Sequence, residues 1–510
     1  MVASLTRSKI QSLQELAETL SSARRDGCRI VHCHGVFDPL HVGHIKHFQQ
    51  ARQFGDVLVV TVTPDHFVNK GPHRPVFTGT LRAEAIAALE CVDYVAVNEW
   101  ATAVNTIQLL KPAYFVKGSE FETGKDRTGA ISVEQEAVES VGGEIAFTHD
   151  LTFSASNLVN RHLSVFPPEV SEYLAQFSDR YGADDVLRYL DRAQQLKVLV
   201  VGEAIIDEYQ YCETMGKSGK EPILASRYLD QERFAGGALA VANHVASFCD
   251  NVSLLTYLGR ENSHEDFIRE HLSPNVDPHF LYLDGAPTIV KRRFVERYPL
   301  QKLFEIYEMC DDERAAALTP SLSRQLRGLL PNYDVVIVTD FGHGMMTQPV
   351  IDLLGTEAPF LSVNTQMNAA NRGFHTISKY PRADYISISE SEVRLDARSR
   401  IRDLREIAAG LGAKLSCRQL MITRGKSGSV CYDALAGFHE VPALTTQVVD
   451  RVGAGDAVLG VTSLCAAQRA PIDVIGLIGN AVGAQAVATV GNQRPVARNE
   501  LVRYIECLLK

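Results

Sequence analysis

Short apolar runs rich in valine and isoleucine alternate through most of the chain with segments whose apolar residues recur every three to four positions. The continuous runs predict strands that are buried on both faces, and the recurring spacing predicts amphipathic helices. Strands and helices in alternation are typical of parallel sheets covered by helices on both sides. The pattern therefore predicts an α/β protein built on doubly wound sheets.

The predicted strands fall into two series, which are separated by a Pro-Pro stretch and a charged, amphipathic segment. The first series has strands at residues 28–35, 56–64, 92–98, 113–118 and 144–148. The second series opens with a strand at residues 197–209 and continues to a late glycine-rich segment. These positions predict four parts: an N-terminal helix over residues 1–27, a first domain over 28–165, a helical linker over 166–196 and a second domain over 197–510.

Composition and charge narrow the class of protein. The 510 residues, 45% of them hydrophobic, are enough for two sizeable cores. The formal net charge of -10 argues against nucleic acid as the main partner, although a local basic cluster can still bind a small anion. The ten cysteines are scattered and form no C-x-x-C pair, which predicts reduced thiols. We see no signal-peptide core and no apolar run long enough for a membrane span, so we expect a cytoplasmic protein without membrane contact.

The string GVFDPLHVGH, at residues 35–44, places two histidines directly after the first predicted strand. Doubly wound sheets bind ligands at this edge, because the loops that follow the strands meet there. His41 and His44 share one face of the helix that begins here, and three interpretations are open for them. Zinc would need further ligands, and a purely structural role would leave the flanking glycines without a purpose. Phosphate binding accounts for more of the string, since glycines allow close approach and helix N-termini attract anions.

GVFDPLHVGH, together with KPAYFVKGSEF and FSASNLV, resembles the cytidylyltransferase-like nucleotidyltransferases over residues 28–163, in their sugar-phosphate branch. The resemblance implies a Rossmann-like domain that joins a nucleoside triphosphate to a sugar 1-phosphate and releases pyrophosphate. The acceptor phosphate oxygen is itself the nucleophile, so the protein supplies positioning and charge neutralisation. The family implies that His41 and His44 stabilise charge on the reacting phosphates. It also implies nucleotide or phosphate contacts at Gly35, Phe37, Lys70, Lys117, Ser154 and Ser156. Each lysine alone would more often be a solvated surface charge, and only its position in the family pattern indicates a phosphate contact.

In the second series, DRVGAGDA at residues 450–457 precedes an apolar helical run. The segment combines a glycine-rich turn, a helix N-terminus and a carboxylate. Its backbone amides can form an anion pocket for a transferring phosphoryl group, and Asp456 can accept the proton of an attacking hydroxyl.

This string, with GEAIIDEY, AGGALAVAN, LMITRGKSG and IGNAVGA, resembles the ribokinase-like sugar kinases over about residues 197–495. The resemblance implies a sugar pocket formed by Asp207, Gly236 and Gly237. It implies an ATP site at Thr423, Gly425, Gly428, Gly453, Ala454, Gly455 and Asn480. Glu392 would organise Mg²⁺ through water, and Lys291 and Arg293 would hold a phosphate already on the acceptor, unless they are surface charges.

Together the two halves resemble the bifunctional enzymes of ADP-heptose synthesis, with the order of the domains reversed. The implied substrates are ATP, a second nucleoside triphosphate (ATP or CTP) and a sugar phosphate, with Mg²⁺ as cofactor. A homodimer is a possible assembly. Four positions depart from the heptose kinase pattern: Ala240, His343, Gln366 and Ser389. Two alternatives therefore stay open: the same chemistry on another sugar or polyol with CTP, or a kinase-fold sensor fused to an active transferase.

Overall fold

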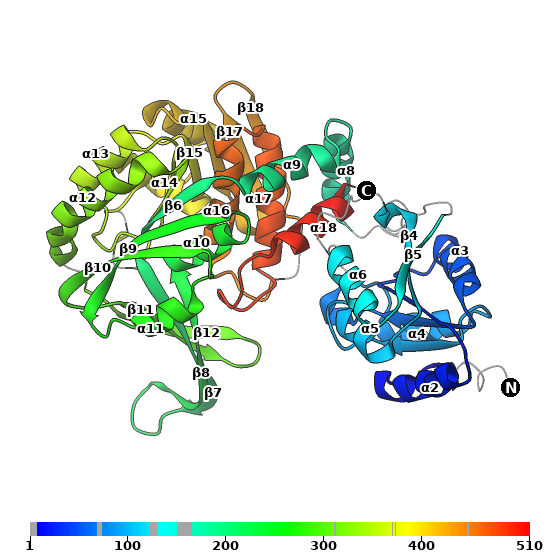
Figure 1. Cartoon of the computed structure of the whole chain (residues 1–510). Helices are drawn as coiled ribbons and strands as arrows, with labels where there is room; N and C mark the ends of the chain where they lie inside the picture. Colours follow the sequence, from blue (N-terminus) through cyan, green and yellow to red (C-terminus); the bar gives the residue numbers. More distant parts are fainter. Residues whose placement is uncertain are drawn as a thin grey trace. The chain divides into compact units, whose positions relative to one another are not determined.

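The computed structural model describes residues 8–68, 74–122, 130–149, 166–310, 313–369, 371–372, 374–445 and 448–509. The chain folds into two compact units (Figure 1). Unit 1 comprises Met1–Leu174 and Val502–Lys510, and unit 2 comprises Ala175–Leu501. Each unit contains a parallel sheet with helices on both faces, so the predicted fold class is confirmed.

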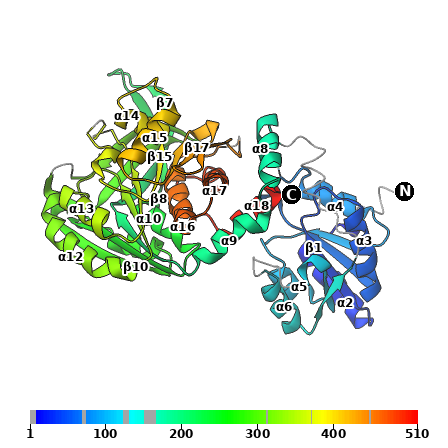
Figure 2. The ribbon, with the colours of Figure 1, turned by 90° about the horizontal axis from the view of Figure 1, so that it is seen from above.

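Unit 1 is built on a five-stranded parallel sheet of order β3-β2-β1-β4-β5. The strands are β1 (Ile30–Gly35), β2 (Val57–Val62), β3 (Tyr94–Val97), β4 (Tyr114–Gly118) and β5 (Glu144–Thr148). The helices are α2 (Leu13–Arg25), α3 (Val42–Ala51), α4 (Gly79–Ala87), α5 (Val104–Leu110) and α6 (Ala130–Ser140), and they flank the sheet (Figure 2). The strand order reverses between β1 and β4, so the carboxyl end of β1 lies at the switch point where such sheets bind ligands.

Alternating side chains of β1 serve two different cores. Val31 and Cys33 pack with Phe48 of α3, whereas Ile30 packs with Leu16 and other residues of α2. These residues are almost completely buried, as expected for a strand covered on both faces.

Unit 2 is built on a nine-stranded sheet of order β10-β9-β6-β13-β14-β15-β16-β17-β18, in which only the last two pairings are antiparallel. Its strands are β6 (Lys197–Gly202), β9 (Asn251–Glu261), β10 (Val276–Pro287), β13 (Val335–Asp340), β14 (Leu361–Thr365), β15 (Tyr385–Ser389), β16 (Gln419–Thr423), β17 (Ser429–Asp433) and β18 (Gly437–Val441). One group of helices is α10 (Ala238–Ala246), α16 (Ala454–Ala467) and α17 (Ile472–Ala486). A second group, which packs into a separate core with the sheet, is α12 (Thr319–Leu329), α13 (Gln348–Glu357), α14 (Glu390–Asp396) and α15 (Leu404–Lys414). Unit 2 also contains α9 (Ala183–Ala193) and α11 (Glu265–His271). Two further helices, α8 (Pro168–Ser178) and α18 (Arg498–Leu508), each have residues in both units.

A second, four-stranded sheet of order β12-β11-β7-β8 also belongs to unit 2, and we call it the lid sheet. Its strands are β7 (Ala204–Lys217), β8 (Leu224–Gly237), β11 (Ile289–Glu296) and β12 (Gln301–Glu308). The strand predicted over residues 197–209 is therefore wrong as a single element. It is two strands in two sheets, β6 and β7, with the break at Glu203. Gly202 ends β6 close to β13, where a Cβ would lie 2.1 Å from Oγ1 of Thr339.

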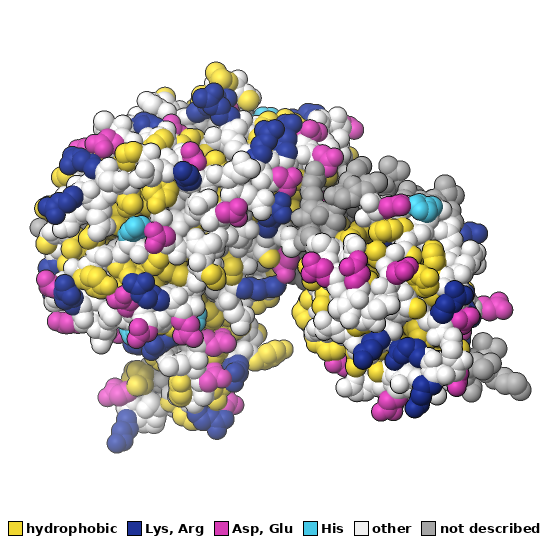
Figure 3. All heavy atoms as spheres, in the orientation of Figure 1, with side chains coloured by type: hydrophobic (Ala, Val, Ile, Leu, Met, Phe, Trp, Pro, Cys, Tyr) yellow, Lys and Arg dark blue, Asp and Glu magenta, His cyan; other side chains and the backbone are white. Residues whose placement is uncertain are grey.

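The tip of the β7–β8 hairpin exposes the apolar side chains of Met215, Ile223, Leu224 and Tyr228. On the face drawn in Figure 3, acidic and basic side chains are interspersed rather than gathered by sign. All ten cysteines carry free thiols, as their spacing predicts. Within the described ranges, no helix is both long and apolar enough to cross a lipid bilayer.

Candidate active sites

The first candidate site lies at the carboxyl end of β1. Gly35 ends the strand, and a Cβ on this residue would lie 2.9 Å from Cζ of Phe37. Phe37 has a φ of 50° and a buried ring, which meets the ring of His44 edge-on at 5.2 Å between centroids. The Phe37 side chain therefore supports His44 from the core, so a nucleotide contact at Phe37 would have to come from its backbone.

His41 and His44 form a stacked pair at the start of α3, with 3.8 Å between ring centroids. His41 caps the helix, because its Nδ1 accepts the amide of Gly43 at 3.1 Å. Nδ1 of His44 accepts the amide of His41 at 3.4 Å. Since both Nδ1 atoms act as acceptors, each neutral ring carries its proton on Nε2. In this tautomer each ring keeps an N–H donor on Nε2, and a donor is the polarity that a phosphate requires.

Two buried side chains hold the loops around this pair. Asp38 accepts the amides of Val76 at 2.6 Å and Phe77 at 2.9 Å, which shows that it fixes the neighbouring loop. The Arg82 guanidinium is buried and forms an ion pair with Asp65 at 2.5 Å. It also donates to three carbonyl oxygens of separate segments, those of Val36, Thr63 and Phe77. Sequence reasoning did not identify Arg82 as a site residue, because its partners lie in segments that are distant in sequence.

Lys117 lies at the end of β4, next to β1 in the sheet. Its Nζ is 2.7 Å from Oε2 of Glu134, and the side chain is 13% exposed, so it is not a solvated surface charge. Burial, assisted by the charge of Lys117, lowers the pKa of His32 to about 3 and that of His47 to about 4. A phosphate at Lys117 would compete with Glu134. Three further predicted contacts lie outside the described residues: Lys70, Ser154 and Ser156.

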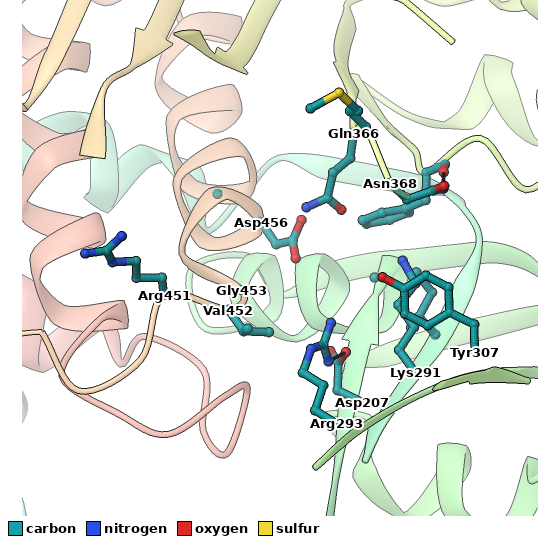
Figure 4. A pocket seen from close by; sticks show the side chains of 15 residues that line it. Asp207, Lys291, Arg293, Tyr307, Gln366, Asn368, Arg451, Val452, Gly453 and Asp456 are labelled. Atoms are coloured by element: carbon teal, nitrogen blue, oxygen red, sulfur yellow. Dashed lines mark hydrogen bonds and ion pairs between the residues drawn. The ribbon is translucent and has the colours of Figure 1, made fainter. Parts of the chain in front are cut away.

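The second candidate site is a cavity of about 320 Å³ between the lid sheet and the start of α16 (Figure 4). The lid sheet contributes Ile205, Asp207, Gly237, Lys291, Arg293 and Tyr307. The loops after β13 and β14 contribute Phe341, Gln366, Met367 and Asn368. The glycine turn contributes Arg451, Val452, Gly453, Gly455 and Asp456. The predicted sugar side and the predicted phosphoryl side therefore meet in one cavity.

Asp456 lies in the first turn of α16 and points into this cavity (Figure 4). Its burial and the nearby charge of Asp207 raise the pKa of Asp456 to about 7, against the opposing effect of Lys291. A carboxylate with a pKa near neutrality is well suited to accept a proton from a hydroxyl group.

Gly453 caps α16 in the left-handed region, with a φ of 81°. A Cβ at this position would lie 1.8 Å from Oδ1 of Asn492. The turn therefore requires glycine here for two reasons, the positive φ and the contact with Asn492. Asn492 also reaches Asp207, with 3.4 Å between Nδ2 and Oδ2. Asn492 is a site residue that sequence reasoning missed, because it approaches the turn from a distant loop.

Asp207, Lys291 and Arg293 come from the paired strands β7 and β11, where Lys291 lies opposite Asp207. Arg293 forms an ion pair with Asp207 and a second with Glu305 at 3.2 Å. Both basic side chains are largely buried, which excludes the surface-charge interpretation. Gly236 leaves room for Asp207, since a Cβ there would lie 2.1 Å from Oδ2 of that carboxylate.

Gly237 follows in the left-handed region at the start of α10, with a φ of 57°, and lines the cavity. A Cβ at Gly237 would lie 2.6 Å from the carbonyl oxygen of Glu203, which makes the close approach of β7 and β8 possible. Glycine is thus required at the two predicted sugar-pocket positions for different reasons: Gly236 leaves room for the Asp207 side chain, and Gly237 lets the backbones of β7 and β8 approach.

The predicted ATP-binding residues of LMITRGKSG gather at the carboxyl end of β16, away from the lining of this cavity. Thr423 ends the strand, and Gly425 and Gly428 have positive φ values in the turn that follows. Asn480 of α17 donates to Oγ of Ser429 at 2.7 Å, at the start of the next strand. Ala454 and Gly455 lie in the first turn of α16.

Both oxygens of Glu392 accept backbone amides, those of Met367 and Ser389, each at 3.0 Å. The charge of Glu392 contributes to the raised pKa of Asp456, so these carboxylates lie in one electrostatic environment. The Glu392 carboxylate therefore ties the start of α14 to a loop that lines the cavity.

Glu203, at the end of β6, supports the same cavity although sequence reasoning missed it. Its buried carboxylate accepts the amides of Phe341 at 3.0 Å, His343 at 3.1 Å and Met345 at 3.4 Å. Burial and the charge of Asp340 raise the pKa of Glu203 to about 7. The only sign of this role in the sequence is that Glu203 is an acidic residue directly after an apolar strand.

His343, one of the departures from the family pattern, is buried in the loop that Glu203 holds. Neither ring nitrogen has a hydrogen-bond partner among the described atoms. Burial, with the neighbouring charge of Lys291, lowers the pKa of His343 to about 3, so the ring is neutral. The lysine of the family pattern is therefore replaced by an uncharged group.

The folds and sites define a protein of two α/β domains, each with a candidate site for phosphate chemistry. Residues 195–499 match the family described as pfkB family carbohydrate kinase, and residues 32–156 match the family described as cytidylyltransferase-like. Because the first match covers more than half of the chain, the chain belongs to the pfkB family of carbohydrate kinases.

Curated relatives match the N-terminal part of the chain. The bifunctional protein HldE of Geobacter sulfurreducens is 37% identical over 166 residues, which is 32% of each chain. The HldE protein of Geotalea uraniireducens is 40% identical over 139 residues, or 27% of each chain. The chain thus spans about a third of the length of the curated relatives it matches.

Among solved structures, phosphofructokinase-2 from Escherichia coli in complex with substrates and products superposes with a TM-score of 0.50 at 12% identity. The match covers 62% of this chain and 100% of that chain. At this identity the likeness concerns the fold alone.

Proposed function

We propose that the protein catalyses two reactions of nucleotide-sugar synthesis. In the first, a sugar or sugar phosphate of the heptose 7-phosphate type is phosphorylated by ATP. In the second, a nucleoside triphosphate donates its nucleotidyl group to a sugar 1-phosphate and pyrophosphate is released. A sugar 7-phosphate would become a 1,7-bisphosphate in the first reaction, so a separate phosphatase would have to hydrolyse its 7-phosphate before the second. The observation that carries the proposal is the meeting of Asp456 with Asp207, Lys291 and Arg293 in one cavity.

In the kinase reaction, the acceptor hydroxyl oxygen attacks the γ-phosphorus of ATP and its proton passes to Asp456, while ADP leaves. The pKa of Asp456 near 7 allows this carboxylate to be ionised at neutral pH and still to accept a proton. The amides of the glycine turn, at the positive end of α16, receive the negative charge of the transferring group. Asp207 orients the acceptor, and Lys291 and Arg293 bind a phosphate that it already carries.

The residues around the glycine turn fit a magnesium ion that arrives with ATP. The charges of Asp207 and Glu392 both raise the pKa of Asp456, which marks a negative potential that a divalent cation would relieve. Magnesium commonly binds through one or two carboxylates, waters and substrate phosphates, so the small number of carboxylates here suffices. Bound magnesium would neutralise charge on the phosphates, with Glu392 holding it through water.

In the nucleotidyl transfer, a phosphate oxygen of the sugar 1-phosphate attacks the α-phosphorus of the triphosphate, and pyrophosphate leaves. The Nε2–H groups of His41 and His44 donate to the phosphate oxygens as negative charge shifts to the leaving group. Lys117, Lys70, Ser154 and Ser156 complete the phosphate contacts in this proposal. The second nucleotide, ATP or CTP, and a homodimeric assembly stay predictions.

A second candidate is the same pair of reactions on another sugar or polyol, with CTP as the nucleotide. The neutral ring of His343 and the amide of Gln366 favour it, since both stand where the heptose kinase pattern has a charged side chain. A cavity with fewer cations is suited to an acceptor with more hydroxyl groups and less negative charge.

The test uses the purified full chain with ATP, Mg²⁺ and a panel of sugars, sugar phosphates and polyols. CTP or ATP is then added, after a phosphatase treatment where the acceptor was a sugar phosphate. Mass spectrometry of the products should show a phosphorylated sugar first and a nucleotide sugar second. Pyrophosphate release with sugar 1-phosphates but no phosphorylation of any acceptor would contradict the kinase half and favour a sensor domain.

A further inference from the structure

Asp450, directly before the glycine turn, is a buried carboxylate with a crowded set of partners. Its side chain is 2% exposed. Five donors surround it: the amides of Arg451 at 2.7 Å, Val452 at 3.2 Å and Gly491 at 3.0 Å, the hydroxyl of Tyr209 at 2.5 Å, and the ammonium of Lys302. So complete a set of donors fixes the carboxylate in one orientation.

These donors belong to three parts of unit 2: the lid sheet, the glycine turn and, for Gly491, the loop after α17. Tyr209 lies on β7 and Lys302 on β12, so both come from the lid sheet. The amides of Arg451 and Val452 belong to the glycine turn, and both residues line the cavity. Asp450 is therefore a direct link between the lid sheet and the segment that receives the transferring phosphoryl group.

The charge of Asp450 needs compensation on two grounds. A buried carboxylate without a counter-charge is unfavourable, and a negative charge next to the glycine turn would repel an incoming phosphate. Lys302 supplies the counter-charge, with its Nζ also 5.4 Å from the ring centroid of Tyr209. Burial would raise the pKa of Asp450, but the bonds from Lys302 and Tyr209 outweigh it and lower the pKa.

Lys302 differs from its partner in exposure, since its side chain is 36% exposed and that of Asp450 is 2% exposed. The lysine thus reaches the carboxylate from the rim of the lid sheet, and it can withdraw without disturbing a hydrophobic core. An exposed cation that meets a buried anion across two elements has the properties of a latch.

We propose that Lys302 is a tethered cation that latches the lid sheet onto the glycine turn. Its contact with Asp450 orders the amides of residues 451 and 452 and removes a repulsive charge from the phosphoryl site. Lys302 is a positioning residue, because it acts through Asp450 and not on the substrate. The inference rests on the proposed kinase function for its catalytic consequence, but the latch itself can be measured without turnover.

The first experiment measures hydrogen exchange of the amides of residues 451 and 452 in the full chain. Lys302→Met keeps an unbranched side chain out to Cε and removes the ammonium group, and Lys217→Met, at the exposed end of β7, is the matched control. We expect exchange at least tenfold faster in Lys302→Met and unchanged in Lys217→Met. Equal exchange in wild type and Lys302→Met would overturn the latch.

The second experiment tests the charge. Lys302→Ala removes the side chain beyond Cβ, so propylammonium can replace the missing atoms, whereas propanol offers the same shape without the charge. Propylammonium, but not propanol, should restore slow exchange, and rescue by both would show that only packing matters. In an Asp450→Asn background, Lys302→Met should change the exchange less than twofold, because its partner charge is already absent.

Kinase turnover then separates the latch from the proposed function. We expect Lys302→Met to lower kcat/KM for phosphorylation about 10- to 100-fold while pyrophosphate release by unit 1 stays unchanged. Faster exchange in a chain whose wild type phosphorylates no acceptor would leave the latch standing and refute the kinase proposal. Faster exchange with unchanged kinase turnover would show that the latch does not position the glycine turn for phosphoryl transfer.

Discussion

Arg293 on β11 forms an ion pair with Asp207 on β7, inside the cavity that also contains Asp456. The two side chains have opposite tasks in the proposed reaction, since Asp207 would bind hydroxyl groups and Arg293 a phosphate. Their pairing keeps a buried carboxylate and a buried guanidinium neutralised before any substrate enters. When a phosphorylated acceptor binds, its hydroxyl would pair with Asp207 and its phosphate with Arg293. The ion pair is therefore suited to select an acceptor that carries both groups.

Replacement of Arg293 should therefore discriminate between acceptors. We expect Arg293→Met to raise KM for a phosphorylated sugar about 10- to 100-fold, because a charge-assisted bidentate contact is lost. KM for the unphosphorylated sugar should change much less. Arg227→Met, on the exposed part of β8, is the control and should change neither value. Equal increases for both sugars would mean that Arg293 serves only to hold Asp207.

Asp456→Asn should abolish the base and change the pH dependence. In the wild type, kcat/KM for phosphorylation should rise with pH through about 7, the pKa to which burial and Asp207 bring this carboxyl. Turnover in Asp456→Asn should fall about 100- to 10,000-fold, the range expected for loss of a general base. Initial-rate measurements from pH 5 to 9 test both points. A wild-type profile without this rise would refute the role of Asp456 as the base.

The same substitution should stabilise the protein. The folded state holds the Asp456 proton with a pKa of about 7, well above the ordinary value of 3.8. The resulting stability is fully present below the ordinary value and is lost as the pH rises through about 7. The loss is on the order of 2–4 kcal/mol, and the uncharged amide of Asp456→Asn avoids it. Thermal unfolding at pH 8 should therefore show a higher Tm for the variant, with the two Tm values converging at acid pH.

The site residues that could be identified from the sequence share one property: the residues that act together are neighbours in the chain. Gly453 and Asp456 occupy one turn, and His41 and His44 occupy another, so strand end, glycine and helix start could be inferred together. Asn492, Glu203 and Arg82 act through contacts that join segments far apart in the chain, and no local pattern marks them.

The division of residues 197–209 between two sheets shows the same limit. Both halves of this segment are buried, so the periodicity contains no break. The chain leaves the nine-stranded sheet at Glu203, whose carboxylate accepts amides of the loop after β13, and β13 lies far away in the sequence. The fold class can be predicted from local periodicity. The path of the chain into the lid sheet depends on contacts with strands that are distant in the sequence.

For unit 1, two substitutions of His41 separate helix capping from phosphate binding. Asn can cap the helix as His41 does but cannot reach as far as Nε2. We expect both His41→Asn and His41→Ala to lower pyrophosphate release about 100- to 1,000-fold, while only His41→Ala lowers the Tm. If His41→Asn retains full pyrophosphate release, the histidine is only a helix cap.

The buried histidines of unit 1 should make its stability sensitive to acid. Burial and the charge of Lys117 lower the pKa of His32 to about 3 and that of His47 to about 4, from an ordinary value of 6.5. The unfolded chain therefore binds protons that the folded unit cannot, and the stability present above 6.5 is lost as the pH falls toward 3–4.

The loss amounts to a few kcal/mol for each histidine, on the order of 3 kcal/mol for His47. His47→Gln keeps a polar group near Thr148, the partner of His47 at 2.7 Å, and removes one titrating imidazole. Its Tm should fall less steeply than that of the wild type between pH 6.5 and 4. His66→Gln, at an exposed position, should leave the slope unchanged. Parallel Tm curves for His47→Gln and wild type would show that another group controls the acid sensitivity. His47 could then not be a histidine that stays neutral in the folded unit while it takes up a proton in the unfolded chain.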